Sequence, residues 1–312
     1  MSTLSSDKKF IKGFWQVADP KIWIASTIPM VLGVILSLIY DKGYNVFWMI
    51  LSFIGIYLIE TGKNAINECI DYISGADRMI DKEHKTPFSG GKKTITSGLL
   101  TVKQSAFIGV MTMTAAALSG LAIVLFKEPK VLIIGLAGIV IAILYSLPPF
   151  KFCYRGFGEI AVGVTFGPLI LNGMYVVMSG RFDVLPVLIS IPIGLLITNV
   201  LWINQFPDYE ADKAAGKRNG VVRMGKEKAI KVYILIFILA YLSIIPIIIY
   251  TRSFIWLMTI LTMPVALKAV KTSKESYDNI PELVAANAAT IKIYVLTGLL
   301  FIISMLAEVY IL

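Results

Sequence analysis

Long apolar stretches constrain this chain more than any other feature of its sequence. A helix needs roughly 17–25 mostly apolar residues to cross a hydrocarbon core about 30 Å thick. Nine segments of the 312 residues meet that requirement: 21–39, 46–70, 105–126, 131–147, 158–178, 184–206, 229–250, 254–270 and 289–311. We therefore predict an all-α fold, a polytopic membrane bundle of nine transmembrane helices, with residues 1–312 forming a single domain.

The composition excludes the main alternatives. With 57% hydrophobic and only 16% charged residues, the chain is more apolar than soluble domains, which carry about 25% charge. A formal net charge of +9 on such a chain is typical of loops that face an anionic cytoplasmic leaflet. We therefore expect the lipid bilayer as a partner and no nucleic acid. Two cysteines and one histidine offer no zinc, haem or disulfide framework.

The distribution of basic residues predicts the orientation. If the N-terminus is cytoplasmic, 23 of the 29 lysines and arginines lie on the cytoplasmic side, five lie on the other side, and Lys63 lies within a span. Lysine and arginine accumulate in the cytoplasmic loops of membrane proteins. We predict a multi-pass protein of the cell membrane with its N-terminus in the cytoplasm and its C-terminus on the opposite side.

The second apolar segment carries several polar and ionisable residues. Glu60, Lys63, Asn64, Asn67 and Asp71 follow one another at spacings of 3, 1, 3 and 4, which places them on one stripe of a helix. Ionisable groups at the centre of a membrane helix cost at least about 2.5–3.5 kcal/mol each, so this stripe is expected to face the protein interior or a wet cavity. An ion pair between Glu60 and Lys63 would reduce that cost.

The end of the sixth apolar segment repeats part of this pattern. Asn204, Asp208 and Asp212 have the spacing i, i+4 and i+8, which predicts a second polar stripe on one helix. The unit Asn-x3-Asp-Tyr occurs in both places, 137 residues apart. We interpret the two copies as an internal repeat of four spans, residues 21–147 and 158–270, followed by a ninth helix over 289–311.

Two carboxylate clusters repel each other across a cavity unless a cation joins them. Mg²⁺ is suited to this because it takes oxygen ligands and is usually held by one or two carboxylates together with substrate phosphates. Basic residues that accompany the clusters are candidates to bind phosphate oxygens: Lys21, Arg78, Lys92, Lys217 and Arg218. Because a departing diphosphate needs both a metal and basic side chains, we predict a diphosphate site with Mg²⁺ as its cofactor.

Taken alone, these residues also fit other interpretations. Polar helix ends are common where a span meets the membrane surface, so the acids are also consistent with simple flanks of the spans. The glycine pair Gly90-Gly91 is more typical of a turn than of a phosphate-binding loop. A charged stripe in a helical repeat is typical of secondary transporters as well, although carriers bind near the midplane and these acids cluster at one face.

Several short motifs are more specific when they are taken together. They occupy residues 67–77, 89–91, 96–100, 145–149, 154–159, 166–168 and 208–218. Jointly they resemble the UbiA-type intramembrane prenyltransferases, and in particular the 1,4-dihydroxy-2-naphthoate prenyltransferase branch. The resemblance implies a bundle whose central cavity opens sideways to lipid, with a cytoplasmic cap formed by two loops, residues 71–103 and 207–228.

The resemblance also implies an activity and a set of metal ligands. The activity is Mg²⁺-dependent transfer of a polyprenyl group from an allylic polyprenyl diphosphate to a lipid-soluble aromatic acceptor such as dihydroxynaphthoate, in menaquinone or related quinone biosynthesis. The family motifs assign one metal to Asn67, Asp71 and Asp77, and the other metal to Asp208 and Asp212.

Two departures from the family pattern bear on the acceptor. Glu68 stands where the family usually has Asp, and Asp19 precedes Pro20-Lys21 where the naphthoate branch tends to have Arg. Prenyl transfer to a glycerophosphate ether-lipid precursor therefore stays an alternative.

Four side chains are expected to act in catalysis. Asp71 and Asp208 would assist ionisation of the diphosphate through bound Mg²⁺. Tyr145 would support the allylic cation by a cation–π interaction, and Glu159 would accept the proton that the acceptor ring releases. We expect the polar lining of the cavity to consist of Glu60, Lys63, Asn64 and Asn204.

Overall fold

The fold is entirely helical, with connecting turns, in the part of the chain that the computed structural model describes, residues 5–75, 86 and 91–310. The helices in chain order are α1 (Ser6–Ala18), α2 (Ile24–Leu36), α3 (Val46–Ser74), α4 (Val102–Phe126), α5 (Val131–Ser146), α6 (Gly158–Val164), α7 (Ile170–Ser179), α8 (Val184–Asn204), α9 (Tyr209–Ala214), α10 (Gly220–Met224), α11 (Lys226–Leu242), α12 (Ile245–Thr251), α13 (Met263–Ser276) and α14 (Ile280–Tyr310). Short π-helical or 3₁₀ turns extend or connect several of them: Ser37–Asp41, Phe152–Tyr154, Thr165–Leu169 and Phe254–Thr262.

Eight helical segments among the described residues are long and apolar enough to cross a membrane, which confirms the prediction of an all-α membrane protein. They are Ile24–Asp41, Val46–Ser74, Val102–Phe126, Gly158–Ser179, Val184–Asn204, Lys226–Thr251, Phe254–Ser276 and Ile280–Val309. Each overlaps one of the apolar stretches found in the sequence. The remaining stretch, 131–147, forms the shorter apolar helix α5.

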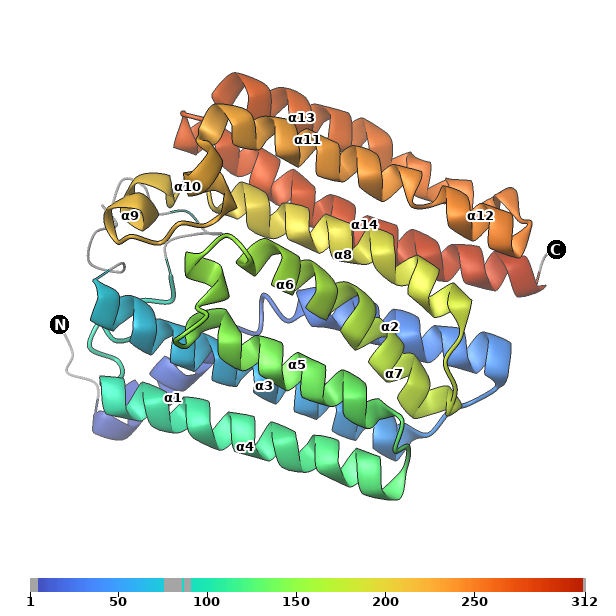
Figure 1. Cartoon of the computed structure of the whole chain (residues 1–312), viewed down its shortest axis with the longest axis horizontal. Helices are drawn as coiled ribbons and strands as arrows, with labels where there is room; N and C mark the ends of the chain where they lie inside the picture. Colours follow the sequence, from blue (N-terminus) through green and yellow to red (C-terminus); the bar gives the residue numbers. More distant parts are fainter. Residues whose placement is uncertain (1–4, 76–85, 87–90, 311–312) are drawn as a thin grey trace.

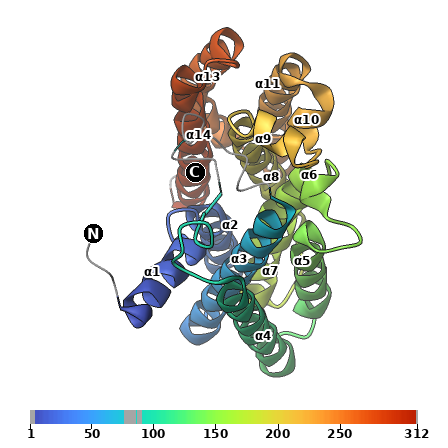
Figure 2. The ribbon, with the colours of Figure 1, turned by 90° about the vertical axis from the view of Figure 1, so that its left-hand side faces the viewer.

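The long helices lie side by side along one direction, and the two chain termini lie at opposite ends of the bundle (Figure 1). Helices α9 and α10 lie at the end where α3 and α8 finish (Figure 1). Viewed from that end, α11 and α13 lie at one edge and α4 and α5 at the other, with α2 and α8 between them (Figure 2). The two polar motifs therefore reach the same end of the molecule.

Side-chain caps mark where several spans begin. The Oδ1 atom of Asn45 accepts a hydrogen bond from Trp48 N at 3.2 Å at the start of α3. Thr101 and Gln104 form a reciprocal capping box at the start of α4. Asp183 caps α8 in the same manner as Asn45 caps α3. Because the first N–H groups of a helix lack partners within it, these side chains favour helix initiation at these residues.

Close backbone contact joins the α6–α7 segment to α8. A Cβ atom on Gly167 would lie 2.6 Å from the Ser190 carbonyl oxygen and 2.7 Å from the Cα atom of Gly194. Only glycine fits at this crossing. Helix association within lipid depends on such small residues, since lipid is as apolar as the side chains and burial gives little driving force.

The N-terminal segment forms a helix that the sequence analysis did not anticipate. Within α1, Val17 is buried and Phe10 and Phe14 are half-buried against the neighbouring residues. Their spacing is that of one apolar face of an amphipathic helix. The Nδ2 atom of Asn64 donates a hydrogen bond to the Val17 carbonyl oxygen at 3.2 Å. Helix α1 therefore packs against α3 at Asn64.

The second acidic motif differs from its prediction. Asn204, Asp208 and Asp212 do not share one helical stripe, because α8 ends at Asn204 and the separate helix α9 begins at Tyr209. Pro207 explains the break, since proline lacks an N–H group and its ring clashes with the carbonyl four residues earlier. Asp212 can consequently approach the first motif from a different direction.

Replacing Gly167 with Ala is expected to lower the unfolding temperature of the purified protein in detergent. The added methyl group meets the backbone of α8, and overpacking of this kind typically costs about 1–3 kcal/mol. Gly120→Ala is the matched control, because no atom lies within 4 Å of a Cβ built there and alanine is the better helix former. An unfolding temperature for Gly167→Ala at or above that of the control would contradict this helix contact.

Candidate active site

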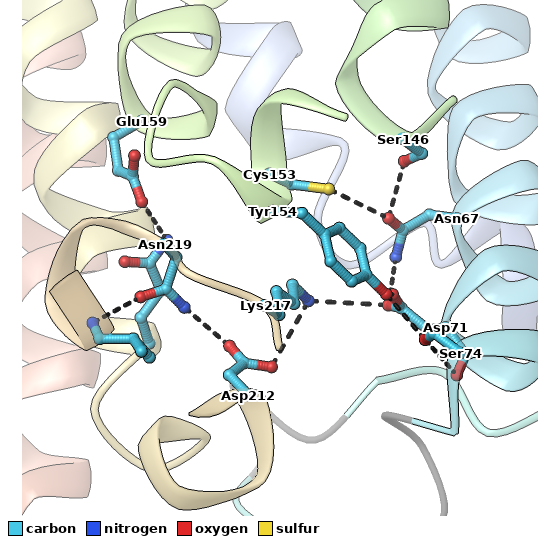
Figure 3. Close-up of polar contacts among 12 residues, drawn as sticks. Asn67, Asp71, Ser74, Ser146, Cys153, Tyr154, Glu159, Asp212, Lys217 and Asn219 are labelled. Atoms are coloured by element: carbon cyan, nitrogen blue, oxygen red, sulfur yellow. Dashed lines mark hydrogen bonds and ion pairs between the residues drawn. The ribbon is translucent and has the colours of Figure 1, made fainter. Parts of the chain in front are cut away.

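The first polar motif ends in a hydrogen-bonded chain. The Nδ2 atom of Asn67 donates to Asp71 Oδ2 at 2.7 Å, one helical turn away on α3. The Oδ1 atom of Asn67 accepts from the hydroxyl of Ser146, at the end of α5, at 2.8 Å (Figure 3). Both side-chain groups of Asn67 are thereby oriented, and Asp71 is held at the end of the bundle.

Tyr154 fixes the other oxygen of Asp71. Its hydroxyl donates to Asp71 Oδ1 at 2.7 Å, and Ser74 Oγ lies 2.9 Å from the same tyrosine oxygen (Figure 3). Burial and the neighbouring Asp71 carboxylate raise the pKa of Tyr154, so the tyrosine remains a hydrogen-bond donor near neutral pH. Its position depends on the turn Phe152–Tyr154 between α5 and α6.

Lys217 joins the two acidic motifs. Its Nζ atom lies 3.7 Å from Asp71 Oδ2 and 3.6 Å from Asp212 Oδ1 (Figure 3). Although burial disfavours the charged amine, the Asp71 and Asp212 carboxylates raise the pKa of Lys217 well above its ordinary value of 10.5. One ammonium faces two carboxylates, so the trio carries a net negative charge when both carboxylates are ionised.

Asp212 is anchored on its other side. The Nδ2 atom of Asn219 donates to Asp212 Oδ2 at 2.7 Å, while Asn219 Oδ1 accepts from Val222 N at 2.9 Å and so caps α10. Burial is the largest of the effects that raise the pKa of Asp212 to about 7, against the opposing effect of Lys217. The loop that carries Asp212 is therefore fixed by the same asparagine that begins the next helix.

Glu159 holds this second loop to the bundle. Its Oε1 atom accepts from Gln205 Nε2 at 2.7 Å and from the backbone N–H of Gly220 at 2.9 Å. The residue is buried and is not among the described side chains that line the cavity below. These contacts connect α6, the end of α8 and the start of α10.

Both departures from the family pattern hold one segment of the chain. The carboxylate of Glu68 accepts from Thr94 Oγ1 at 2.8 Å and from Ile95 N at 3.0 Å. Asp19 forms an ion pair with Lys92, and the side chain of Gln16 donates to the Lys92 carbonyl. The acidic residues at 19 and 68 therefore fasten residues 92–95 to α1 and α3.

An apolar cavity of about 350 Å³ adjoins this charged end of the bundle. Its lining comes from α2 to α7 and is apolar except at a few positions, among them Glu60, Lys63 and Tyr145. Tyr145 directly precedes Ser146, the partner of Asn67, so the cavity begins next to the polar site. An apolar chain in this cavity would have its polar end next to the carboxylates.

Two of the predicted lining residues lie elsewhere among the described residues. Asn64 contacts α1, as noted above, and Asn204 accepts a hydrogen bond from Asn287 of α14 at 2.7 Å. The expected direct ion pair between Glu60 and Lys63 is wrong, because in the described part of the chain Lys63 has no carboxylate within 4.0 Å. The two side chains still attract each other electrostatically over a longer distance, as the sequence suggested. The Nζ atom of Lys63 instead lies 5.5 Å from the ring centroid of Tyr145.

Three further predicted residues lie in connections between helices: Lys21 before α2, Asp208 before α9 and Arg218 before α10. Lys21 and Arg218 are exposed, and Asp208 is half-buried directly before α9. Asp77, Arg78 and the segment 89–90 lie outside the described residues.

Several residues that the structure brings to the site had no role predicted from the sequence. They are Ser146, Cys153, Tyr154 and Asn219, and of these Ser146 and Tyr154 were part of family motifs. The thiol of Cys153 lies 3.9 Å from Asn67 Oδ1, and burial raises its pKa to about 11. The sequence signal that could have identified these residues is a polar residue next to an apolar stretch, but many residues of the chain share that feature.

The oxygen atoms at this site suit a hard divalent cation whose coordination a substrate phosphate completes. Among the described residues, no group of three or more histidine, cysteine, aspartate or glutamate side chains could hold a metal ion by itself. Mg²⁺ is usually bound by one or two carboxylates together with substrate phosphates and water. Asp71 and Asp212, one on each side of Lys217, fit that mode of binding rather than an all-protein cage.

Comparison with known proteins identifies the family. Residues 26–282 match the model of the UbiA prenyltransferase family, and the chain therefore belongs to that family. It is 26% identical to the 1,4-dihydroxy-2-naphthoate octaprenyltransferase of Bacillus subtilis (strain 168), with 82% of this chain and 80% of that protein covered. It is 30% identical to the protein of the same name from Haemophilus influenzae, over 70% of this chain and 71% of that protein.

A solved structure has the same fold. The UbiA homolog from Archaeoglobus fulgidus bound to GPP and Mg²⁺ superimposes with a TM-score of 0.71 at 18% sequence identity, covering 96% of this chain and all of that one. With the family match and the apolar helices, this confirms the resemblance found in the sequence. The protein is a membrane prenyltransferase, an enzyme that transfers an alkyl group larger than methyl.

Tyr154→Phe is expected to lower prenyl transfer by about 10–100-fold with little change in unfolding temperature, because a hydrogen bond to a charged group contributes about 1.5–3 kcal/mol. The change removes only the hydroxyl that orients Asp71. Tyr250→Phe is the matched control, since its hydroxyl contacts Asp183 beyond the opposite end of the spans. Equal rates for the two variants would show that Tyr154 does not position Asp71 for the reaction.

Proposed function

We propose that this enzyme transfers a polyprenyl group from an allylic polyprenyl diphosphate to a lipid-soluble aromatic acceptor such as 1,4-dihydroxy-2-naphthoate, with Mg²⁺, in menaquinone or related quinone biosynthesis. The observation that carries the proposal is that Lys217 forms ion pairs with both Asp71 and Asp212 beside an apolar cavity. A substrate with a diphosphate head and an isoprenoid tail matches both parts. The names of the relatives support naphthoate as the acceptor.

The proposed mechanism starts with the charges of the substrate head. Asn67, Asp71, Asp208 and Asp212, together with Asp77, would hold Mg²⁺, which when bound neutralises charge on the departing diphosphate. The ammonium of Lys217 would turn from the two carboxylates to the diphosphate oxygens. Of the other basic candidates, Lys21 would act from the turn before α2 and Arg218 from the segment before α10, and Lys92 would first have to leave Asp19. Arg78 remains a candidate from the sequence alone.

The remaining steps take place in the cavity. Tyr145 would face the allylic cation with its ring, which stabilises positive charge through the ring quadrupole. The apolar walls would hold the isoprenoid tail and keep water from the cation. The acceptor ring then bonds to the allylic carbon and loses a proton. Glu159 would first have to leave Gln205 and Gly220 and turn toward the cavity to accept that proton.

We further propose a nine-span topology with both termini oriented as the basic residues indicate. Helix α5 would be the ninth span, although its 16 residues measure only about 24 Å along the axis. The opposite ends at which the termini lie support an odd number of crossings (Figure 1). The loops 71–103 and 207–228 would then form a cap on the cytoplasmic side.

The direct test combines purified protein, Mg²⁺, geranylgeranyl diphosphate and 1,4-dihydroxy-2-naphthoate. We expect prenylated naphthoate and free pyrophosphate, and we expect a chelator to abolish both products. Product formed in full with the chelator present would contradict the metal requirement. The same assay with a glycerophosphate acceptor tests the alternative of prenyl transfer to an ether-lipid precursor. Product formed only with that acceptor would favour the alternative.

Asp71→Asn is expected to lower turnover by about 100-fold or more, because the replacement keeps the shape of the side chain and removes a charge worth several kcal/mol to a metal-assisted step. Asp278→Asn is the matched control, since Asp278 pairs with Lys226 outside the site. The unfolding temperature of each variant is measured alongside. Turnover near that of the control would exclude Asp71 from the reaction.

A further inference from the structure

The cavity contains two ionisable side chains whose role the proposed mechanism leaves open. Of the described residues that line it, Lys63 is the one basic residue and Glu60 the one acidic residue. The Nζ atom of Lys63 forms no hydrogen bond or ion pair with any described residue. Ser26 hydrogen-bonds to the carboxylate of Glu60, whose Oε1 atom is buried without a hydrogen-bond partner among the described residues. Charged groups inside a membrane protein are costly unless they are paired, so a bound molecule is the natural source of their partners.

We propose that Lys63 determines acceptor specificity by pairing with the carboxylate of an aromatic acid, while Glu60 receives a hydrogen bond from a hydroxyl of the same ring. This inference rests on the proposed function and names the class of acceptor: aromatic acids with a hydroxyl group near the carboxylate. The two side chains lie three residues apart on α3, and so on one face of the helix. Both face the cavity.

The depth of Lys63 favours the acceptor over the diphosphate as its partner. Lys63 lies eight residues before Asp71 on the continuous helix α3, which corresponds to about 12 Å along the axis. Lys217 already provides an ammonium between Asp71 and Asp212. A diphosphate held at those carboxylates would place its allylic carbon and the acceptor ring deeper in the cavity, toward Lys63.

Because Lys63 lies near the ring of Tyr145, the carboxylate of a bound acceptor would have a second effect. Lys63 Nζ lies 5.5 Å from the ring centroid of Tyr145, the ring that we expect to face the allylic cation. An ammonium beside this ring repels an allylic cation that faces the same ring, and the repulsion is strong where water is excluded. A carboxylate bound to Lys63 neutralises that ammonium, so an acidic acceptor favours formation of the cation, whereas a neutral acceptor leaves the repulsion in place.

The test compares the wild-type protein with Lys63→Met, which keeps the length of the side chain and removes the charge. Binding of 1,4-dihydroxy-2-naphthoate and of 1,4-dihydroxynaphthalene, which lacks the carboxylate, is titrated in detergent. We expect Lys63→Met to weaken binding of the acid by about 30-fold or more, as loss of one partner of a buried charge pair does. Binding of the neutral compound should change by less than about threefold.

Turnover gives the second measurement. In Lys63→Met the KM for the acid should rise while the KM for geranylgeranyl diphosphate stays the same. Lys63→Arg should restore a preference for the acid, and Lys103→Met, at an exposed lysine in the first turn of α4, should behave as the wild type. The unfolding temperature identifies a variant that fails to fold, in which case Lys63→Gln replaces it.

Two results would overturn the inference: equal binding of the acid by the wild type and Lys63→Met, or a raised KM for the diphosphate with an unchanged KM for the acid. If the wild type forms no product with either acceptor, the proposed function fails. The binding titration does not depend on turnover and still decides whether Lys63 recognises the acid.

Discussion

Pairing of buried charge is the constraint on which the rest of this structure depends. Asp71 and Asp212 belong to segments far apart in the chain, yet one lysine contacts both of them. Because a single ammonium cannot neutralise two carboxylates, the trio has room for a further cation. The same arrangement that relieves the cost of buried acids in the free enzyme thus leaves a site that a metal and a diphosphate can complete.

Loops and spans around Asp71, Asp212 and Lys217 have different roles. The loops supply orientation: Tyr154 and Asn219 each hold one carboxylate, and Glu159 fastens the second loop to the bundle. The spans supply an apolar cavity that begins one residue from the polar site, at Tyr145. A reaction that separates a charged leaving group from a carbocation gains from this division, since each product of the ionisation meets the surroundings that stabilise it.

Which parts of the fold could be predicted depends on the range of the interactions behind them. The spans were found because the number of apolar residues needed to cross lipid is a local property. The separation of α8 from α9 was missed, although Pro207 was a local signal, because the repeated spacing of acids suggested a continuous helix. Helix α1 was missed because only one face of it is apolar, so that its residues form no apolar stretch long enough to cross lipid.

The candidate site shows the same division. Asn67, Asp71, Asp212 and the pair Glu60 and Lys63 were identified from spacing, and Lys217 was identified as a basic residue that follows the second acidic cluster. Their partners Tyr154 and Ser146 lie 83 and 79 residues from the atoms they contact, and no local pattern encodes those distances. That Lys63 faces Tyr145 instead of Glu60 is likewise a result of how α3 packs against α5.

Residue order therefore specifies a membrane enzyme with acids at the ends of two spans, because apolar length, helical spacing and the family motifs are all local. The packing of the helices specifies which acid meets which base and where the cavity begins. Those contacts depend on the crossing of helices and the path of loops, and both are settled only when distant segments pack against one another.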